Sequence, residues 1–304
     1  MNSPEISKQF HFLNHTIIKK LNKIGVGKIT PYKKNEIDKL SIPDSFMTSL
    51  PETSIDDFPF TPQDLPKIKD LNRKISAIVK GVKKWMKPGI DIAVIDQYLY
   101  HTLCSQGIFP TMFGYDDFPK ASSISVNSII CHAVPYHYIL RDGDIVSLDL
   151  CGFANGFHTD IAQTYCIGKC SDNAQHLVKI TERCFYEAAA LCKPGILYSS
   201  VGQKIEEIAR QNNCKVIEGF GGHGIGRQLH MKPFVSNQTV LFDNSDHRMK
   251  EGDMFAIEPL LCLGNGKKRQ LADHFGYITA DGSIASHFER VILITKTGYQ
   301  IVNK

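Results

Sequence analysis

The sequence predicts an α+β fold made of two similar halves, because two patterns occur twice along the chain. The motif KPGI at 87–90 returns at 193–196, which is 106 residues further on. The segment RDGDIVSLDL at 141–150 returns as KEGDMFAIEPL at 250–260, which is 109 residues further on. A repeat of this period is too long for the unit of a solenoid and indicates a duplicated half. Two halves that meet face to face enclose a cleft, where binding sites commonly lie.

Residues 1–62 differ from the rest of the chain. Residues 1–34 contain seven lysines and a single acid, Glu5. Five apolar residues recur there at helical spacing: Phe10, Leu13, Ile17, Leu21 and Ile24. A basic, acid-poor, amphipathic start is typical of an organelle-targeting segment, and the alternative is a solvated helix packed on the domain. Five prolines between positions 31 and 62 predict an extended strap rather than a domain.

From residue 63 the same order of elements occurs twice. Apolar residues at helical spacing predict a helix that starts near Pro66 and ends at the first KPGI, and a second helix that ends near Gly107. The later half repeats this order, with helices from about Ser171 to the second KPGI and from there to about Asn213. We therefore expect one domain over 63–304, with halves at about 63–168 and 169–304.

Asp149 and Asp160 are predicted to share one face of a β-hairpin. The Asn-Gly pair at 155–156 is a strong hairpin signal, and a two-residue turn places Asp160 opposite Cys151. Asp149 and Asp160 are then diagonal neighbours. Like charges this close raise the pKa of both carboxyl groups unless a cation lies between them. A metal ion is the simplest explanation, and the alternative is that both acids face solvent.

Three further residues extend this pattern. Glu258 takes the place of Asp149 in the second of the two repeated strands, Glu289 interrupts the apolar strand SHFERVILIT, and His223 lies among glycines that allow a close approach of the backbone. Four carboxylates and one imidazole suit divalent ions harder than zinc in a thiolate site. Such a set exceeds what one ion needs, so two ions that share bridging carboxylates are expected. The segment GFGGHG also fits G-x-G-x-x-G, but no long helix follows it, which disfavours a dinucleotide site.

Composition excludes several other classes. The chain has 304 residues, 42% of them hydrophobic, and a formal charge of +4, which is too small to indicate a nucleic-acid partner by itself. No apolar run approaches the roughly 20 residues of a membrane helix. The nine cysteines form no CxxC pair, which argues against a disulfide framework or a zinc ribbon and favours a reducing, intracellular location.

From about residue 64 to its end, the chain resembles the type I methionine aminopeptidases. The motifs CHAVP (131–135), DGDIVSLDL with GFHTD, GGHGIG with LH, AIEP and HFE occur in that family's order and spacing. The resemblance implies the pita-bread fold, with two pseudo-symmetric α/β halves around a central curved antiparallel sheet and helices on its outer face. It also implies a hydrolase that removes the initiator methionine from nascent proteins and prefers a small second residue.

The resemblance further implies roles for particular residues. The metal ligands would be Asp149, Asp160, His223, Glu258 and Glu289, with Asp160 and Glu289 bridging two divalent ions (cobalt, manganese, iron, zinc or nickel). Glu258 would be the general base, and His132 and His230 would contact the substrate. The methionine pocket would be lined by Tyr115, Phe118, Ser123, Leu229 and Phe275, where the family usually has Cys, Phe and Trp at the last three positions. His287 stands where the family usually has glutamine.

Two alternatives to this function stay open at this point. Prolidases and aminopeptidase P-like Xaa-Pro peptidases share the fold but carry a large amino-terminal domain, and non-catalytic pita-bread binding proteins typically lose ligands. Nothing before Cys104 matches a zinc-finger region, so the chain resembles the finger-less organellar and bacterial-like branch. We expect an intracellular monomer in the mitochondrion or another organelle, with the cytoplasm as the alternative. It would act on nascent polypeptide N-termini near the ribosome, with no nucleic-acid or membrane partner.

Overall fold

The computed structural model describes residues 54–57, 61, 63–239 and 247–304. The expected basic segment over 1–34 and most of the strap therefore lie outside the described residues. The described end of the strap packs on the domain: Ser54 bridges to Lys232, and Lys250 Nζ pairs with Asp56 Oδ1 at 3.0 Å. The expected domain boundaries stay predictions.

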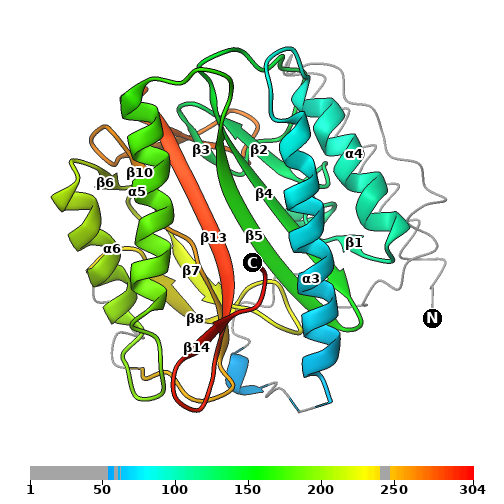
Figure 1. Ribbon diagram of the computed structural model, residues 1–304, viewed down its shortest axis with the longest axis vertical. Helices are drawn as coiled ribbons and strands as arrows, with labels where there is room; N and C mark the ends of the chain where they lie inside the picture. Colours follow the sequence, from blue (N-terminus) through cyan, green and yellow to red (C-terminus); the bar gives the residue numbers. More distant parts are fainter. Residues whose placement is uncertain (1–53, 58–60, 62, 240–246) are drawn as a thin grey trace.

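A large antiparallel sheet forms the centre of the described fold (Figure 1). Its main path runs β1-β4-β5-β13-β9-β7-β8; in addition β2 pairs with β4, β10 and β14 pair with the two ends of β13, and β6 pairs with β10. The bounds are β1 Phe109–Pro110, β2 Ser123–Val126, β4 Ile145–Ala154, β5 Phe157–Cys166, β6 Lys215–Val216, β7 Gly221–Gly224, β8 Met231–Ser236, β9 Met254–Ile257, β10 Leu260–Cys262, β13 Ala285–Ile294 and β14 Tyr299–Ile301. A smaller sheet, β11-β12-β3, joins β3 Ile129–Cys131, β11 Lys268–Gln270 and β12 Tyr277–Thr279.

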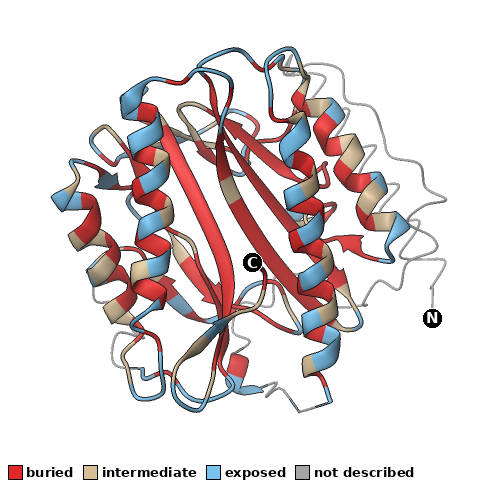
Figure 2. Ribbon diagram, in the orientation of Figure 1, coloured by how far each residue is buried: buried red, intermediate tan, exposed pale blue. Residues whose placement is uncertain are grey.

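Two helices of each half cover the sheet, as the repeat predicts. The first half supplies α3 (Leu65–Val82) and α4 (Ile92–Ser105), and the second supplies α5 (Asp172–Ala189) and α6 (Ser199–Gln211). The described residues also form three short 3₁₀ turns, η2 (Ile55–Asp57), η3 (Lys83–Trp85) and η4 (Tyr115–Asp117). Helices α3 and α5 lie across β4, β5 and β13, whose residues are buried along nearly their whole length (Figure 2). The expected α+β class with helices on one face is confirmed.

The central hairpin has the predicted register. Asp149 pairs with Ala162 and Asp160 with Cys151 across β4 and β5. Asn155 and Gly156 at the turn have φ values of 56° and 86°, the combination that a type I′ turn requires. Both strands run for ten residues, longer than the apolar run alone indicated. Because side chains alternate along a strand, Asp149, Cys151 and Asp160 share one face.

The two halves join where β5 pairs with β13. Glu289 of β13 lies opposite Ala162 of β5, which places its carboxylate beside those of the hairpin. Gly222 lies so near β9 that a Cβ atom built on it would stand 2.0 Å from the Ala256 carbonyl oxygen. The glycines of this segment therefore permit the close approach of backbone to backbone, which brings His223 to the centre of the sheet.

The expectation that Glu258 lies within a strand, as Asp149 does, is wrong. Strand β9 ends at Ile257, and pairing resumes in β10 at Leu260. The reason is Pro259, which lacks the N–H that would continue the ladder. Within the described residues, no helix is long and apolar enough to cross a membrane.

Candidate metal centre

The five predicted ligands converge at one place in the sheet, four of them from strands β4, β5, β7 and β13 and Glu258 from the residue after β9. His223 on β7 is the centre of the group: its Nε2 lies 3.9 Å from Asp160 Oδ2, 3.9 Å from Glu258 Oε1 and 4.0 Å from Glu289 Oε1. Donor atoms of Asp160, His223 and Glu289 all lie within 4.8 Å of one another. Two donors that each bind one ion at about 2.1 Å lie at most about 4.2 Å apart, so the 3.9–4.0 Å separations around His223 Nε2 fit a shared ion.

A second donor group lies on the hairpin side. Asp149, Cys151 and Asp160 also have donor atoms within 4.8 Å of one another. The Cys151 thiol donates to Asp160 Oδ1, with Sγ and Oδ1 3.0 Å apart. Sequence reasoning placed Cys151 opposite Asp160 but gave it no part in the site, although the register was the signal that could have found it.

Burial sets the electrostatics of this cluster. Desolvation and the neighbouring acids raise the pKa values of Asp149, Glu258 and Glu289 well above their usual range, and desolvation raises that of Asp160. Arg290 is adjacent, but its guanidinium donates to the carbonyl oxygens of Ala162 and Glu289 and to Gln163 rather than to the carboxylates.

One carboxylate oxygen of this cluster lacks, within the described part of the chain, the hydrogen-bond partner that a buried oxygen normally has. Glu289 Oε1 is buried and has no hydrogen-bond partner among the described residues. Buried charges are costly unless they are paired or bind a metal. An oxygen-rich donor set with an orphaned acceptor therefore fits divalent cations.

His132 and His230 stand at the wall of the same site. The rings of His230 and His223 meet edge to face with centroids 4.4 Å apart, and His230 Nδ1 lies 2.8 Å from the Tyr115 hydroxyl. His132 follows β3 with a φ of 55°, in the left-handed region. Both side chains are accessible from the cavity. The protein around each imidazole nevertheless desolvates it and lowers its pKa, so the neutral form is favoured.

A cavity of about 260 Å³ opens beside the carboxylates. Its lining includes Asp149, Cys151 and Asp160 and the predicted residues Tyr115, Phe118, His132, Leu229, His230 and Phe275. Phe118 and Phe275 form an edge-to-face pair with centroids 5.4 Å apart, which gives the cavity an aromatic wall.

Ser123, predicted for the same pocket, does not line the cavity. It is fully buried on β2, where it pairs with Asp149 and so shares the face of that carboxylate, but it is covered by other residues and is not part of the cavity lining. Conversely, Met112, Asp116, Gln270, His274 and Tyr277 line the cavity without having been predicted. Gln270 and Tyr277 come from the small sheet, which no sequence pattern indicated.

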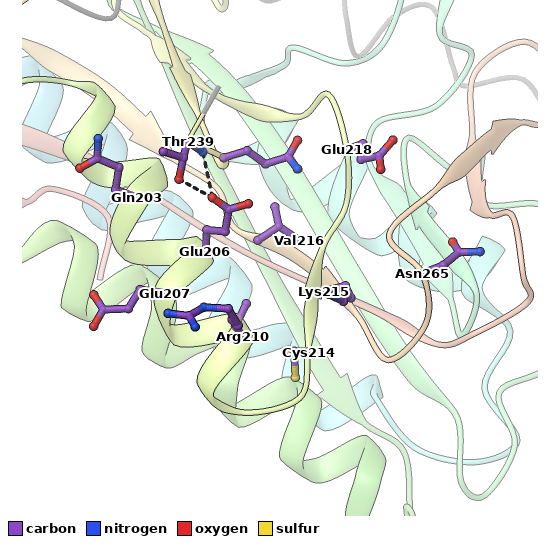
Figure 3. A pocket seen from close by; sticks show the side chains of 12 residues that line it. Gln203, Glu206, Glu207, Arg210, Cys214, Lys215, Val216, Glu218, Thr239 and Asn265 are labelled. Carbon is purple, nitrogen blue, oxygen red and sulfur yellow. Dashed lines mark hydrogen bonds between the residues drawn. The ribbon is translucent and has the colours of Figure 1, made fainter. Parts of the chain in front are cut away.

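A larger cavity, of about 540 Å³, lies elsewhere, between α6 and the segment around Lys215 (Figure 3). Its lining is polar and carries both signs of charge, with the acids Glu206, Glu207 and Glu218 and the bases Arg210 and Lys215. Glu206 already accepts hydrogen bonds from the backbone and hydroxyl of Thr239. Both groups of possible metal ligands found among the described residues contain Asp160, which lines the smaller cavity. The volume of a cavity therefore does not identify the reactive site.

Comparisons with known proteins agree with this geometry. Residues 66–296 match the model of metallopeptidase family M24. The chain is 33% identical to "Methionine aminopeptidase 1" of Bacillus subtilis (strain 168) over 244 residues, covering 80% of this chain and 98% of that protein. It is 31% identical to "Methionine aminopeptidase 1" of Dictyostelium discoideum over 283 residues, covering 91% and 76%.

An organellar relative and solved structures add to this. The chain is 34% identical to "Methionine aminopeptidase 1D, mitochondrial" of Homo sapiens over 221 residues, covering 73% of this chain and 65% of that protein. The structure of the Rickettsia prowazekii methionine aminopeptidase superposes with a TM-score of 0.78 at 26% identity, covering 81% and 99%. A prolidase from Pyrococcus furiosus reaches a TM-score of 0.64 at 18% identity, covering 81% and 65%, which is a likeness of fold alone.

Proposed function

The chain belongs to metallopeptidase family M24, and from this premise we propose that it is a methionine aminopeptidase, which removes the N-terminal methionine from nascent proteins and peptides. The observation that carries the proposal is the convergence of three buried carboxylates, the partly accessible Glu258 and His223 beside a small cavity with an aromatic wall. A metal-dependent hydrolase needs both parts, a ligand set and an adjacent place for the residue that is removed.

The donor separations support a division of the ligands between two divalent ions. Asp160, His223, Glu258 and Glu289 would hold one ion. Asp149, which has donor atoms within 4.8 Å of those of Asp160, would hold the other ion together with the carboxylates that the family resemblance makes bridging, Asp160 and Glu289. Bound divalent ions supply an acidified water and polarise a peptide carbonyl at neutral pH. The identity of the ion is open among cobalt, manganese, iron, zinc and nickel.

The residues of the chain would perform the proton transfers and the positioning. The side chain of Glu258 is 15% accessible, and its pKa is raised, so it is suited to accept a proton from the attacking water. His132 and His230, held neutral, each keep one N–H that can donate to the carbonyl oxygen as negative charge develops there. The Tyr115 hydroxyl would fix the ring of His230, and Phe118 and Phe275 would contact the methionine side chain.

The test is release of free methionine from the peptide Met-Ala-Ser by protein supplied with manganese or cobalt. We expect release that a chelator abolishes and that is lost in Asp160→Ala together with bound metal. Asp70→Ala is the matched control, since Asp70 is a partly exposed acid on α3 that pairs with Arg73 and Lys74. Preferential cleavage of an Xaa-Pro dipeptide over Met-Ala-Ser would favour the alternative Xaa-Pro peptidase, and release of neither product would reject both.

We also propose an organellar location and a monomeric state, with nascent chains near the ribosome as substrates. The basic segment 1–34 and the likeness to proteins named mitochondrial and chloroplastic support the location. A fluorescent protein carrying residues 1–34 should enter the organelle, and replacing Lys19, Lys20 and Lys23 by Glu should keep it in the cytoplasm. Cytoplasmic fluorescence of the unaltered fusion would contradict the location, and the mass of the purified chain in solution tests the monomer.

A further inference from the structure

His287 is a buried histidine at the metal centre that the five-ligand set leaves without a function. It lies on β13 two residues before Glu289, so both side chains point to the same face of the strand. Its side chain is only 3% accessible, and neither ring nitrogen has a hydrogen-bond partner among the described residues. Buried imidazole nitrogens are normally satisfied, so this ring requires a partner that the described side chains do not provide.

The surroundings of His287 resemble those of His223. His287 Nε2 lies 3.8 Å from Glu289 Oε2 and 3.9 Å from Glu258 Oε2. These separations are too long for hydrogen bonds, which span about 2.7–3.2 Å. They match the 3.9–4.0 Å that separate His223 Nε2 from its carboxylate neighbours. His223 therefore faces the Oε1 atoms of Glu258 and Glu289, while His287 faces the Oε2 atoms of the same two residues.

We propose that His287 is a sixth protein ligand of the divalent metal centre, which adds a second imidazole beside His223. The inference rests on the proposed function, since it needs the metal centre, but it concerns a residue outside the expected ligand set. Two imidazoles favour iron, cobalt, nickel and zinc over manganese, because imidazole suits those ions while manganese prefers oxygen donors. His287 would thus bias the centre of this chain towards nitrogen-preferring transition ions.

The experiment counts the imidazoles bound to cobalt by X-ray absorption in the wild-type protein, in His287→Gln and in His176→Gln. Glutamine keeps a polar side chain without an imidazole, and His176 is an exposed histidine on α5 that bonds to the Asn212 carbonyl. We expect one imidazole fewer per centre in His287→Gln than in the wild type, and no change in His176→Gln. Competition titration should show cobalt and zinc affinity at least about tenfold weaker in His287→Gln, with manganese affinity less affected.

Equal imidazole counts and affinities in the wild type and His287→Gln would overturn the inference. If that variant does not fold, His287→Ala serves as the second variant, and a wild-type count of one imidazole per centre overturns the inference without any variant. Methionine release is measured on the same samples. If methionine release is chelator-sensitive but the centre binds only one imidazole, His287 is not a ligand and the proposed function stands. If the centre binds two imidazoles, one of them lost in His287→Gln, but no methionine is released, His287 is a ligand and the proposed function is rejected.

Discussion

Gly222→Ala should damage the metal centre although the glycine carries no donor. A Cβ atom at this position would lie 2.0 Å from the Ala256 carbonyl oxygen, whereas real Cβ contacts essentially never fall below 3.0 Å. Strands β7 and β9 must therefore separate by at least about 1 Å, and they carry His223 and lead into Glu258. A displacement of about 1 Å in a catalytic site can cost about 100-fold in rate.

The assay compares kcat/KM for methionine release, metal affinity and melting temperature in Gly222→Ala and Gly298→Ala. An added methyl group at Gly298 meets nothing within 4 Å, and its φ is not in the left-handed region, so this variant controls for the substitution itself. We expect kcat/KM to fall about 100-fold, with overpacking costing about 1–3 kcal/mol of unfolding free energy. Wild-type metal affinity and kcat/KM in Gly222→Ala would refute the reasoning that β7 must touch β9 to assemble the centre.

Three further predictions concern the same site. The raised pKa values of the four carboxyl groups mean that these groups bind more protons in the metal-free folded state than in the unfolded chain above about pH 4, so their contribution to stability falls as pH rises. The buried histidines, whose pKa values are lowered, act in the opposite sense only below about pH 6.5. Melting temperatures of metal-free and metal-loaded protein should therefore diverge as pH rises above about pH 7, and parallel curves there would contradict this. Tyr115→Phe removes the 2.8 Å hydrogen bond between the Tyr115 hydroxyl and His230 Nδ1, which is worth about 0.5–1.5 kcal/mol, so kcat/KM should fall about 2- to 10-fold. An unchanged kcat/KM would show that the ring of His230 does not depend on this hydrogen bond. Phe275→Ala removes one side of the aromatic wall, so KM for methionine peptides should rise at least about tenfold with kcat little changed; a selective loss of kcat would instead indicate a part in the chemical step.

The site could be predicted from the sequence to different depths at different residues. The hairpin register of Asp149 and Asp160 was correct because the Asn-Gly turn and the two-residue side-chain period act locally and leave few alternatives. Glu258 was placed in a strand that in fact ends one residue earlier, although Pro259 was visible in the sequence. Ser123 was assigned to the pocket and shares the face of Asp149, but it is fully buried and does not line the cavity.

By itself, the sequence determined the repeated order of helices and strands, the central hairpin and the identity of the charged residues that interrupt apolar strands. These features depend on periodicity, turn chemistry and motif spacing within a few residues. Only the tertiary structure decided that β5 pairs with β13, that β7 lies against β9, and that His287 faces the same two glutamates as His223. Such contacts mostly join segments from about 30 to more than 100 residues apart, and the one between β7 and β9 also depends on the absence of a Cβ atom at Gly222. They are set by how the two halves pack, and local sequence patterns do not predict that packing.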